Sequence, residues 1–386
     1  MGLQSYLKKN IKRRSRERIG ILYNPASILP DYTSTLEAIL KSGNGANITA
    51  LFGPQHGLFS HTQDNMITWD GFIHPKLNIP VFSLYGEYRK PTEEMLSYID
   101  TLIIDLQDIG TRVYTFASTM FYCIEECAKY GKKIIVLDRP NPINGDYVEG
   151  YRTEEDFYSF VGMLPVSMRH GLTMGEMACL YKEYKDIDCE IEIMKMKGWK
   201  RNMWFDETYL PWIMPSPNMP TLETAAVYPG IVLLEGTNIS EGRGTTKPFE
   251  MIGAPYIDSE KLIKELGTYK LKGVFFRETH FQPGFNKWEK KLCNGVHIHI
   301  TDRKSFKPYI TGIAIIRAVS KLFSKNFKWK NPPYEYEYEK VPIDVICGTN
   351  RVRKSIENEI KLEEIEEECL EEEKKYMEMR KDFLFY

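Results

Sequence analysis

Charged side chains follow two apolar runs near the middle of the chain. The run 102–104 leads into Asp108, and the run 134–137 leads into Asp138 and Arg139. A helical pattern separates the two runs, which predicts a strand, a helix and a second strand. Ligands of parallel α/β sheets bind at the carboxyl ends of the strands. We therefore expect a polar site at this edge.

Polar residues that suit a sugar ligand are frequent in the predicted loops. Carboxylates can transfer protons or attack at a glycosidic bond. Arginine and amide side chains can hold hydroxyl or carboxylate groups, and aromatic rings stack on sugars. For any single residue, capping a turn or pairing with a neighbour is an alternative role, but folding alone rarely requires so many. The candidates are Gln55, His56, Asp105, Asp108, Arg112, Tyr114, Asp138, Arg139, Asn141, Glu149, Arg169, His170, Asn218, Glu235, Asn238, Glu241 and Arg243.

Motifs for nucleotides, metals and activated nucleophiles are missing from the sequence. There is no GxxxxGK[ST] loop, and the first predicted strand lacks GxGxxG. His297 and His299 share one face of a predicted strand without an evident third ligand, and HExxH is absent. No GxSxG elbow occurs either. We therefore expect a site that uses no cofactor and no metal.

The composition indicates a globular protein of 386 residues, long enough for two domains. Its net charge of −2 argues against nucleic acid as the main partner. No apolar run approaches the ~18 residues of a membrane span. Residues 1–17 are basic but lack the apolar core of a signal peptide, so we expect a solvated lead-in. Oligomeric state cannot be inferred.

The cysteines favour a reducing compartment. There are seven, an odd number, and they are scattered without a CxxC motif. Together with the missing signal peptide, they predict a cytoplasmic protein. Secretion by another route stays open.

Strands alternate with helices in the first part of the chain, which predicts a parallel sheet covered on both faces. Thr92 and Thr173 are expected to cap helices. The segment 210–255 is rich in proline, glycine and asparagine, and we expect a long functional loop there. From about residue 258 the pattern becomes mixed α+β. It includes an amphipathic helix over 308–323, a turn and exposed strand over 331–340, and an acidic C-terminal helix.

Eight segments in order resemble one family, the family long known as DUF1343. Its characterised members are exo-β-N-acetylmuramidases of the NamZ type. The resemblance extends from Arg18 to Tyr386, where the closing FLFY also looks like the family's usual end. The matching segments are ILYNPAS, LFGPQHGLF, SLYGEYRKPT, DLQDIGTRVYTF, VLDRPNPINGDYVEG, MRHGLTMGE, MPSPNMPTLETAAVYPG and LEGTNISEGRGTTKPFEMIGAP.

The resemblance implies both a fold and an activity. It implies a Rossmann-like catalytic domain, placed at 18–245, and a smaller α+β auxiliary domain at 246–386, with the active cleft between them. The implied activity is release of N-acetylmuramic acid from the non-reducing end of peptidoglycan fragments. Peptidoglycan-derived amino sugars are thus the expected partners. Arg112, Arg139 and Arg243 are candidates to grip the lactyl carboxylate.

One position departs from the resemblance. Where family members often read FGPEHG, this chain has Gln55, and an amide can neither donate a catalytic proton nor act as a base at neutral pH. The essential carboxylate then lies elsewhere, with Glu87, Asp108 and Glu241 as candidates. Alternatively, the 2-acetamido group of the substrate acts as the nucleophile beside a single protein acid. A third possibility is a protein that binds muropeptide sugars without cleaving them.

Among these alternatives, we favour Asp108 and Glu241 for acid/base work. Asp108 follows a predicted strand end, and Glu241 lies in a glycine-flanked loop that allows close backbone approach to a ligand. His56 is expected to orient a carboxylate or to contact the substrate.

Overall fold

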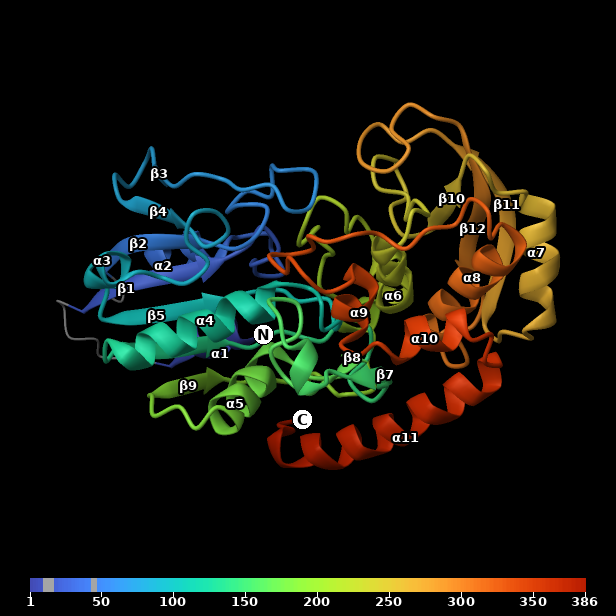
Figure 1. The fold of residues 1–386 in the computed structure, drawn as a ribbon. Helices are drawn as coiled ribbons and strands as arrows, with labels where there is room; N and C mark the ends of the chain where they lie inside the picture. The colour runs from blue at the N-terminus through green and yellow to red at the C-terminus, as the bar shows by residue number, and fades with distance from the viewer. Residues whose placement is uncertain (10–16, 43–46) are drawn as a thin grey trace.

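Within the described residues, 1–9, 17–42 and 47–386, a computed structural model shows a seven-stranded sheet in the N-terminal half (Figure 1). The strand order is β3-β4-β2-β1-β5-β6-β9, and only the short edge strand β3 is antiparallel to its neighbour. The strands are β1 (Arg18–Tyr23), β2 (Asn47–Gly53), β3 (Phe72–Ile73), β4 (Pro80–Ser83), β5 (Thr101–Asp105), β6 (Lys133–Leu137) and β9 (Ile191–Met194).

Helices cover both faces of this sheet, as the alternating pattern predicted. Thr92 caps α3 by accepting a hydrogen bond from the Met95 amide, and Thr173 caps α5 in the same way through Glu176. Both predicted caps are therefore confirmed. The helices and short elements of this half are α2 (Thr35–Lys41), α3 (Glu93–Ser97), α4 (Phe116–Lys129), η1 (Glu155–Phe157), α5 (Met174–Tyr184) and η2 (Phe205–Thr208), with the small hairpin β7 (Glu149–Arg152) and β8 (Ser167–Arg169).

The first residues of the chain form part of this packing. Helix α1 (Gly2–Lys8) buries Leu3 and Tyr6, and the Gly2 amide donates to the carbonyl oxygen of Asp138 at 2.8 Å. The prediction of a solvated lead-in over 1–17 is wrong for residues 1–9, because an apolar pair one turn apart gives the helix a face to bury. Residues 10–16 lie outside the described part of the chain.

The C-terminal half is built around a second sheet, which is three-stranded in the part of the chain that the structure describes. Its antiparallel order is β10 (Met251–Ala254), β12 (Cys293–Ile300) and β11 (Val274–Phe281). Helices α7 (Ser259–Thr268) and α8 (Pro308–Leu322) pack beside it (Figure 1). The predicted α/β fold with a smaller mixed second domain is confirmed. No described helix combines the length and apolar character needed to cross a membrane.

Part of the expected loop over 210–255 is helical. It contains α6 (Leu222–Ile231), capped by Thr221, and the 3-10 helix η3 (Val232–Gly236). Apart from the exposed Glu223, helix α6 is buried, so tertiary packing offsets the hydrogen bond lost at Pro229. It packs closely on α8, where an added Cβ on Gly230 would lie 1.7 Å from the carbonyl oxygen of Pro308.

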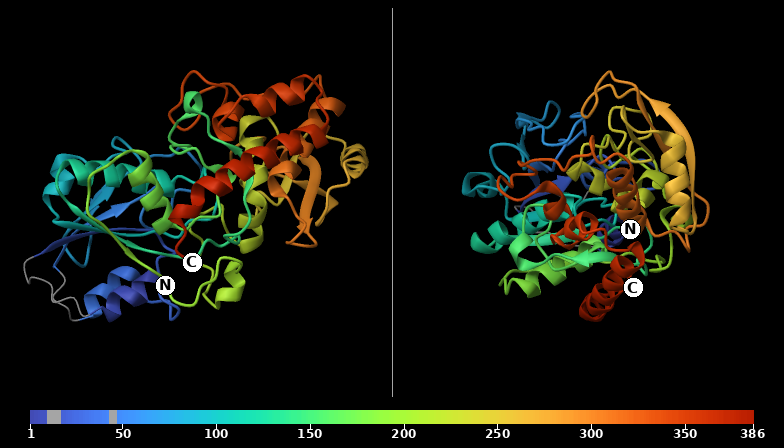
Figure 2. Two further views of the ribbon diagram at one scale, coloured as in Figure 1. Left: turned by 90° about the horizontal axis from the view of Figure 1, so that it is seen from below. Right: turned by 45° about the vertical axis from the view of Figure 1, so that its right-hand side comes forward.

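The predicted acidic C-terminal helix is divided in two. Its two parts are α10 (Arg351–Glu357) and, after a turn with positive φ at Glu359, α11 (Leu362–Arg380). Helix α9 (Pro342–Cys347) precedes them, and η4 (Lys381–Phe383) follows. Helix α11 crosses both halves of the molecule and packs against β7, which brings the C-terminus back beside α1 and β6 (Figures 1 and 2). There the Tyr386 hydroxyl donates to Asp138 Oδ2 at 2.7 Å.

The segment 331–340 differs most from its prediction. It forms a turn instead of an exposed strand, and Tyr334 and Glu335 are both buried. Its alternation of tyrosine and glutamate imitates a strand, but Pro332 and Pro333 cannot donate to a sheet, and Glu335 and Tyr336 have positive φ. As a result, the carboxyl group of Glu335 points inward.

Candidate active site

A narrow polar hollow with a cavity volume of about 30 Å³ lies where loops of the two halves meet. The N-terminal sheet contributes the loops after β2 and β5. The C-terminal half contributes residues around α6 and the turn after Pro333. Six of the candidates predicted from the sequence line it: Gln55, His56, Tyr114, Asn218, Glu235 and Arg243.

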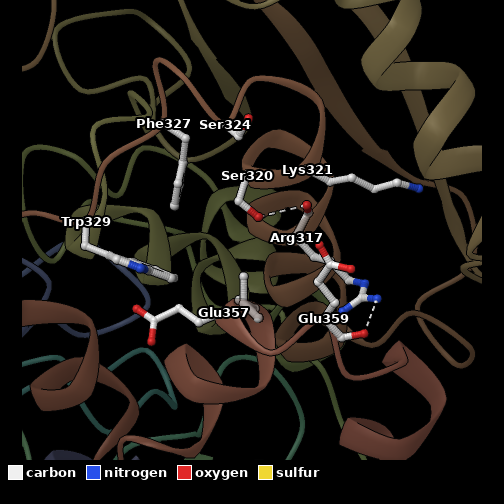
Figure 3. A pocket seen from close by; sticks show the side chains of 9 residues that line it. Arg317, Ser320, Lys321, Ser324, Phe327, Trp329, Glu357 and Glu359 are labelled. Atoms are coloured by element: carbon white, nitrogen blue, oxygen red, sulfur yellow. Dashed lines mark hydrogen bonds between the residues drawn. The ribbon is translucent and has the colours of Figure 1, made fainter.

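A much larger hollow, with a cavity volume of about 430 Å³, lies in the C-terminal half beside α8 and α10 (Figure 3). Its lining includes Arg317, Trp329 and Glu357, and none of the predicted site residues. The convergence of predicted polar residues therefore distinguishes the hollow between the two halves, and we take that one as the candidate site.

Gln55 connects the two halves of the molecule at the bottom of the site. Its Nε2 donates to Glu335 Oε1 at 3.3 Å, and its Oε1 accepts from Thr115 Oγ1 at 2.5 Å. The side chain is only 6% exposed. Both ends of the amide are thus engaged, and it holds a neighbouring carboxyl group in place.

Glu335 was not among the residues predicted from the sequence. Its Oε2 accepts from the Tyr85 hydroxyl at 2.7 Å, so both carboxyl oxygens receive hydrogen bonds from neutral groups. Burial, reinforced by the nearby Glu235, raises the pKa of Glu335 to about 7. The two prolines before it were the sequence signal against a strand, but nothing in the sequence indicated which turn residue would be buried.

Glu235 and Arg243 form an ion pair that also lines the site. Arg243 Nη2 lies 2.7 Å and Nε 3.2 Å from Glu235 Oε1, and the Tyr334 hydroxyl donates to Glu235 Oε2 at 2.7 Å. Although burial acts in the opposite direction, the carboxylates of Glu235 and Glu241 raise the pKa of Arg243. The guanidinium therefore supplies a permanent positive charge.

Glu241 lies behind this pair and does not line the hollow. Its Oε2 is 2.8 Å from Lys287 Nζ, and its Oε1 is 3.4 Å from Arg243 Nε. Burial alone would raise the pKa of Glu241, but Lys287 and then Arg243 outweigh it and lower the pKa. The structure therefore argues against Glu241 as a proton donor, since it holds the side chain as an ionised carboxylate.

His56 is buried with a left-handed backbone conformation, φ +70°. Its Nδ1 lies 2.9 Å from the carbonyl oxygen of Thr62 and so carries the proton, which leaves Nε2 as an acceptor. Burial lowers the pKa of His56 to about 4. The imidazole is thus neutral at pH 7 and can accept a hydrogen bond from a ligand.

Asp108 and His170 form a buried pair outside the lining of the hollow. Asp108 Oδ2 accepts from the Gly110 amide at 2.6 Å and lies 3.4 Å from His170 Nε2. His170 Nδ1 accepts from the Leu172 amide, so the proton is on Nε2, facing Asp108. Among the described residues Asp108 Oδ1 has no partner. The geometry indicates a role in shaping the loop after β5.

Three arginines that were expected to contact ligands instead form hydrogen bonds and ion pairs within the fold. Arg112 donates to the carbonyl oxygens of Tyr151, Val166 and Ile346. Arg139 makes a two-nitrogen pair with Asp105, and Arg169 pairs with Glu149 at 2.7 Å. Each guanidinium is buried. Of the arginine candidates for a substrate carboxylate, Arg243 alone lines the candidate site as the described residues define it.

The remaining candidates also stabilise loops. Burial raises the pKa of Asp138 to about 6, and its carboxyl group accepts from Thr173, Gly175 and Tyr386. Asn141 bridges Ile143 and Leu172. Asn238 bonds to Asn326, Lys328 and Tyr256, and Glu87 is exposed away from the hollow.

Comparison with known proteins finds relatives that match both halves of this chain. The N-terminal family model of the exo-β-N-acetylmuramidase NamZ matches residues 19–223, and the C-terminal model matches residues 226–386. The chain is 41% identical over 385 residues to the peptidoglycan β-N-acetylmuramidase NamZ of Bacillus subtilis (strain 168), covering 100% of this chain and 91% of that protein.

Two solved structures have the same fold. Both are crystal structures of DUF1343 family proteins from Bacteroides fragilis NCTC 9343. One has a TM-score of 0.88 at 31% identity, and the other a TM-score of 0.75 at 28% identity. Each comparison covers 100% of this chain and 98% of the other.

Proposed function

Since this chain belongs to the NamZ family of exo-β-N-acetylmuramidases, we propose that it hydrolyses the β-glycosidic bond of N-acetylmuramic acid at the non-reducing end of peptidoglycan fragments. The observation that carries the proposal is the match of both family models across both halves, whose junction forms a polar hollow with two carboxyl groups. Glycosidases require such groups for proton transfer at the scissile bond.

The sugar's lactyl carboxylate has a suitable partner in Arg243. The guanidinium lines the hollow, and its Nε and Nη2 bond to Glu235 while no hydrogen bond within the described residues uses Nη1. A guanidinium edge binds a carboxylate through directed hydrogen bonds. Asn218 and the neutral His56 supply further polar contacts for hydroxyl or acetamido groups.

The direct test uses the purified protein and a β-1,4-linked N-acetylmuramic acid–N-acetylglucosamine disaccharide. We expect release of free N-acetylmuramic acid, and much slower cleavage of the matched β-N-acetylglucosaminide, which lacks the lactyl ether. Equal turnover of both glycosides would indicate a hydrolase of another 2-acetamido sugar.

The competing function is a binding protein for muropeptide sugars. It is the alternative because Gln55 occupies the loop after β2, where an amide cannot transfer a proton. Calorimetric binding of N-acetylmuramic acid without turnover of the disaccharide between pH 5 and 8 would favour the binding protein and overturn the enzyme. Action in a reducing compartment such as the cytoplasm stays a prediction.

A further inference from the structure

We propose that Glu335 is the general acid of this site, held in position by Gln55 and Tyr85. The inference rests on the proposed glycosidase function and deepens it. Glu335 comes from the C-terminal half, whereas both positioning residues come from the N-terminal half. The proton donor would therefore be in place only when the two halves are packed together.

Among the described residues, the carboxyl groups that line the hollow are those of Glu235 and Glu335. Glu235 receives two hydrogen bonds from the Arg243 guanidinium and one from the Tyr334 hydroxyl. Of the two carboxyl groups, only that of Glu235 accepts hydrogen bonds from a cation, and a proton on Glu235 would compete with these contacts. Glu335 is therefore the remaining candidate for the proton donor.

The surroundings of Glu335 favour the protonated form of its carboxyl group. Its hydrogen-bond partners are an amide and a phenol, and the charge of Arg243, which favours the ionised form, acts without a hydrogen bond to it and is outweighed by burial. Its side chain is 5% exposed. The pKa of about 7 that results from burial and from the neighbouring Glu235 leaves a substantial protonated fraction at neutral pH, which suits an acid catalyst.

The two positioning residues are themselves fixed. Tyr85 is fully buried, with its ring at 5.6 Å from that of Tyr336 in an edge-to-face contact. Gln55 is anchored by Thr115. Once Glu335 has lost its proton, the donors of Gln55 and Tyr85 already point at its two oxygens. They would stabilise the carboxylate without reorganisation.

The proton balance of the reaction is simple. The Glu335 proton moves to the glycosidic oxygen as the bond from that oxygen to the anomeric carbon breaks, and the remaining sugar leaves as a neutral alcohol. The water that provides the new hydroxyl group on the anomeric carbon then returns a proton to the carboxylate. One water is consumed and the acid is restored.

The test is the variant Glu335→Gln on two substrates that differ in leaving group. For the disaccharide, whose alcohol must be protonated to leave, we expect kcat/KM to fall by about 10²–10⁴-fold. For the 4-nitrophenyl β-glycoside of N-acetylmuramic acid, whose phenolate leaves without a proton, we expect less than about tenfold loss. The alkaline limb of the wild-type pH profile near 7 should also disappear with the disaccharide.

The control is Glu337→Gln, which changes the same residue type in the same turn. Glu337 accepts from the amides of Glu339 and Lys340 and does not line the hollow, so both substrates should be turned over normally. Equal loss on both substrates in Glu335→Gln, with an unchanged Tm, would show a structural role and overturn the proposal.

Glu335→Asp is measured if the glutamine variant does not fold. Aspartate keeps an ionisable carboxyl group, but its shorter side chain holds the proton farther from the glycosidic oxygen. Activity on the disaccharide should therefore again fall more than activity on the nitrophenyl glycoside. Equal losses would overturn the assignment. Turnover by the wild-type protein is a separate readout: if it cleaves neither substrate, the proposed function fails, whereas Glu335 is judged only by the ratio between substrates.

Discussion

Four arginines were candidate ligand-binding residues in the sequence because each guanidinium can bind a carboxylate. Their surroundings in the structure differ. Arg112 donates to three backbone carbonyls, while Arg139 and Arg169 each neutralise a buried carboxylate. Arg243 also has carboxylate partners but faces the hollow. Residue type therefore indicates which ligand a side chain can bind, and the packing around it decides whether its donors are free for one.

The Arg243→Lys variant tests the role of the guanidinium at the residue scale. Lysine keeps the positive charge beside Glu235 but cannot make two parallel hydrogen bonds. We expect KM for the N-acetylmuramic acid disaccharide to rise by about tenfold, the equivalent of ~1.4 kcal/mol. Arg277→Lys, on exposed β11, serves as the control. An unchanged KM in Arg243→Lys would exclude this contact with the lactyl group.

The Gln55→Glu variant tests coupling to Glu335. It places a second carboxyl group within hydrogen-bond distance of Glu335 Oε1, where the wild-type amide lies at 3.3 Å. Two carboxyl groups at this separation cannot both ionise easily, so they share a proton and the pKa of the second ionisation rises. We expect the alkaline limb of the pH–activity profile to shift upward by about one unit. A limb that stays in place would contradict contact between the two side chains.

At the scale of elements, close backbone approaches set the shape of the C-terminal half. Helices α6 and α8 meet at Gly230 and Gly312, where each backbone occupies the space a Cβ would need. Gly230 belongs to one of the family motifs, but nothing in the sequence indicated that it would pack against Gly312.

The Gly230→Ala variant should be strongly destabilised. Its Cβ would lie 1.7 Å from the Pro308 carbonyl, so α6 and α8 must separate, at a cost of about 2 kcal/mol or more. The matched control is Gly267→Ala, since nothing lies within 4 Å of the Cβ built at that helical position. Alanine favours helix there, and we expect stabilisation of about 0.5–1 kcal/mol. Denaturant unfolding measures both, and similar stabilities for the two variants would refute the close crossing.

The Tyr386 hydroxyl is one of the groups that anchor the end of the chain to the N-terminal half. Tyr386→Phe removes the donor to buried Asp138 Oδ2, at 2.7 Å in the wild type. We expect a loss of about 1–3 kcal/mol in the free energy of unfolding, with the disaccharide KM unchanged because Asp138 does not line the site. Tyr209→Phe, at a tyrosine that is 93% exposed, should leave stability unaltered. If both variants unfold alike, the C-terminus is not anchored at this point.

At the scale of the whole molecule, the site exists only because the two halves are packed together. Helix α11 crosses from the C-terminal half to the β7–β8 hairpin of the N-terminal half and returns the chain end to the region where it began (Figure 2). The contacts of Glu335 with Gln55 and Tyr85 then span separations of 280 and 250 residues. A variant that loosens this packing should lose activity before it loses secondary structure.

The pH dependence of stability belongs to this scale too. A carboxyl group whose folded pKa exceeds its unfolded value keeps its proton in the folded chain, so its contribution to stability is present below the unfolded pKa and is lost as pH rises. For Glu335 this window runs from 4.5 to about 7. At ~1.4 kcal/mol per pKa unit, the upper limit is ~3.5 kcal/mol.

The measurement compares the free energy of unfolding of the wild type and Glu335→Gln from pH 4.5 to 8. The difference isolates Glu335 from other groups, including His56, whose lowered pKa makes stability rise with pH up to about its unfolded value of 6.5. We expect the wild type to lose its advantage over the variant as pH rises. A difference that does not vary with pH would show that Glu335 titrates normally.

The sequence by itself determined the local features of this protein. The capping threonines at 92 and 173, the alternation of strands and helices, and the family motifs were readable because they depend on neighbours close in the chain. The six candidate residues that reach the hollow were also readable, since they lie in segments predicted as polar loops, either after a strand or within 210–255.

Only the tertiary structure decided which polar groups share the site and which stabilise the fold. Arg139 and Asp105 satisfy each other because neighbouring strand ends bring them together, so neither is free for a ligand. Glu335 looked like an exposed strand residue, because its burial depends on loops more than 200 residues away. Burial and partner charge are properties of the assembled chain, and they determine which carboxyl group holds a proton at neutral pH.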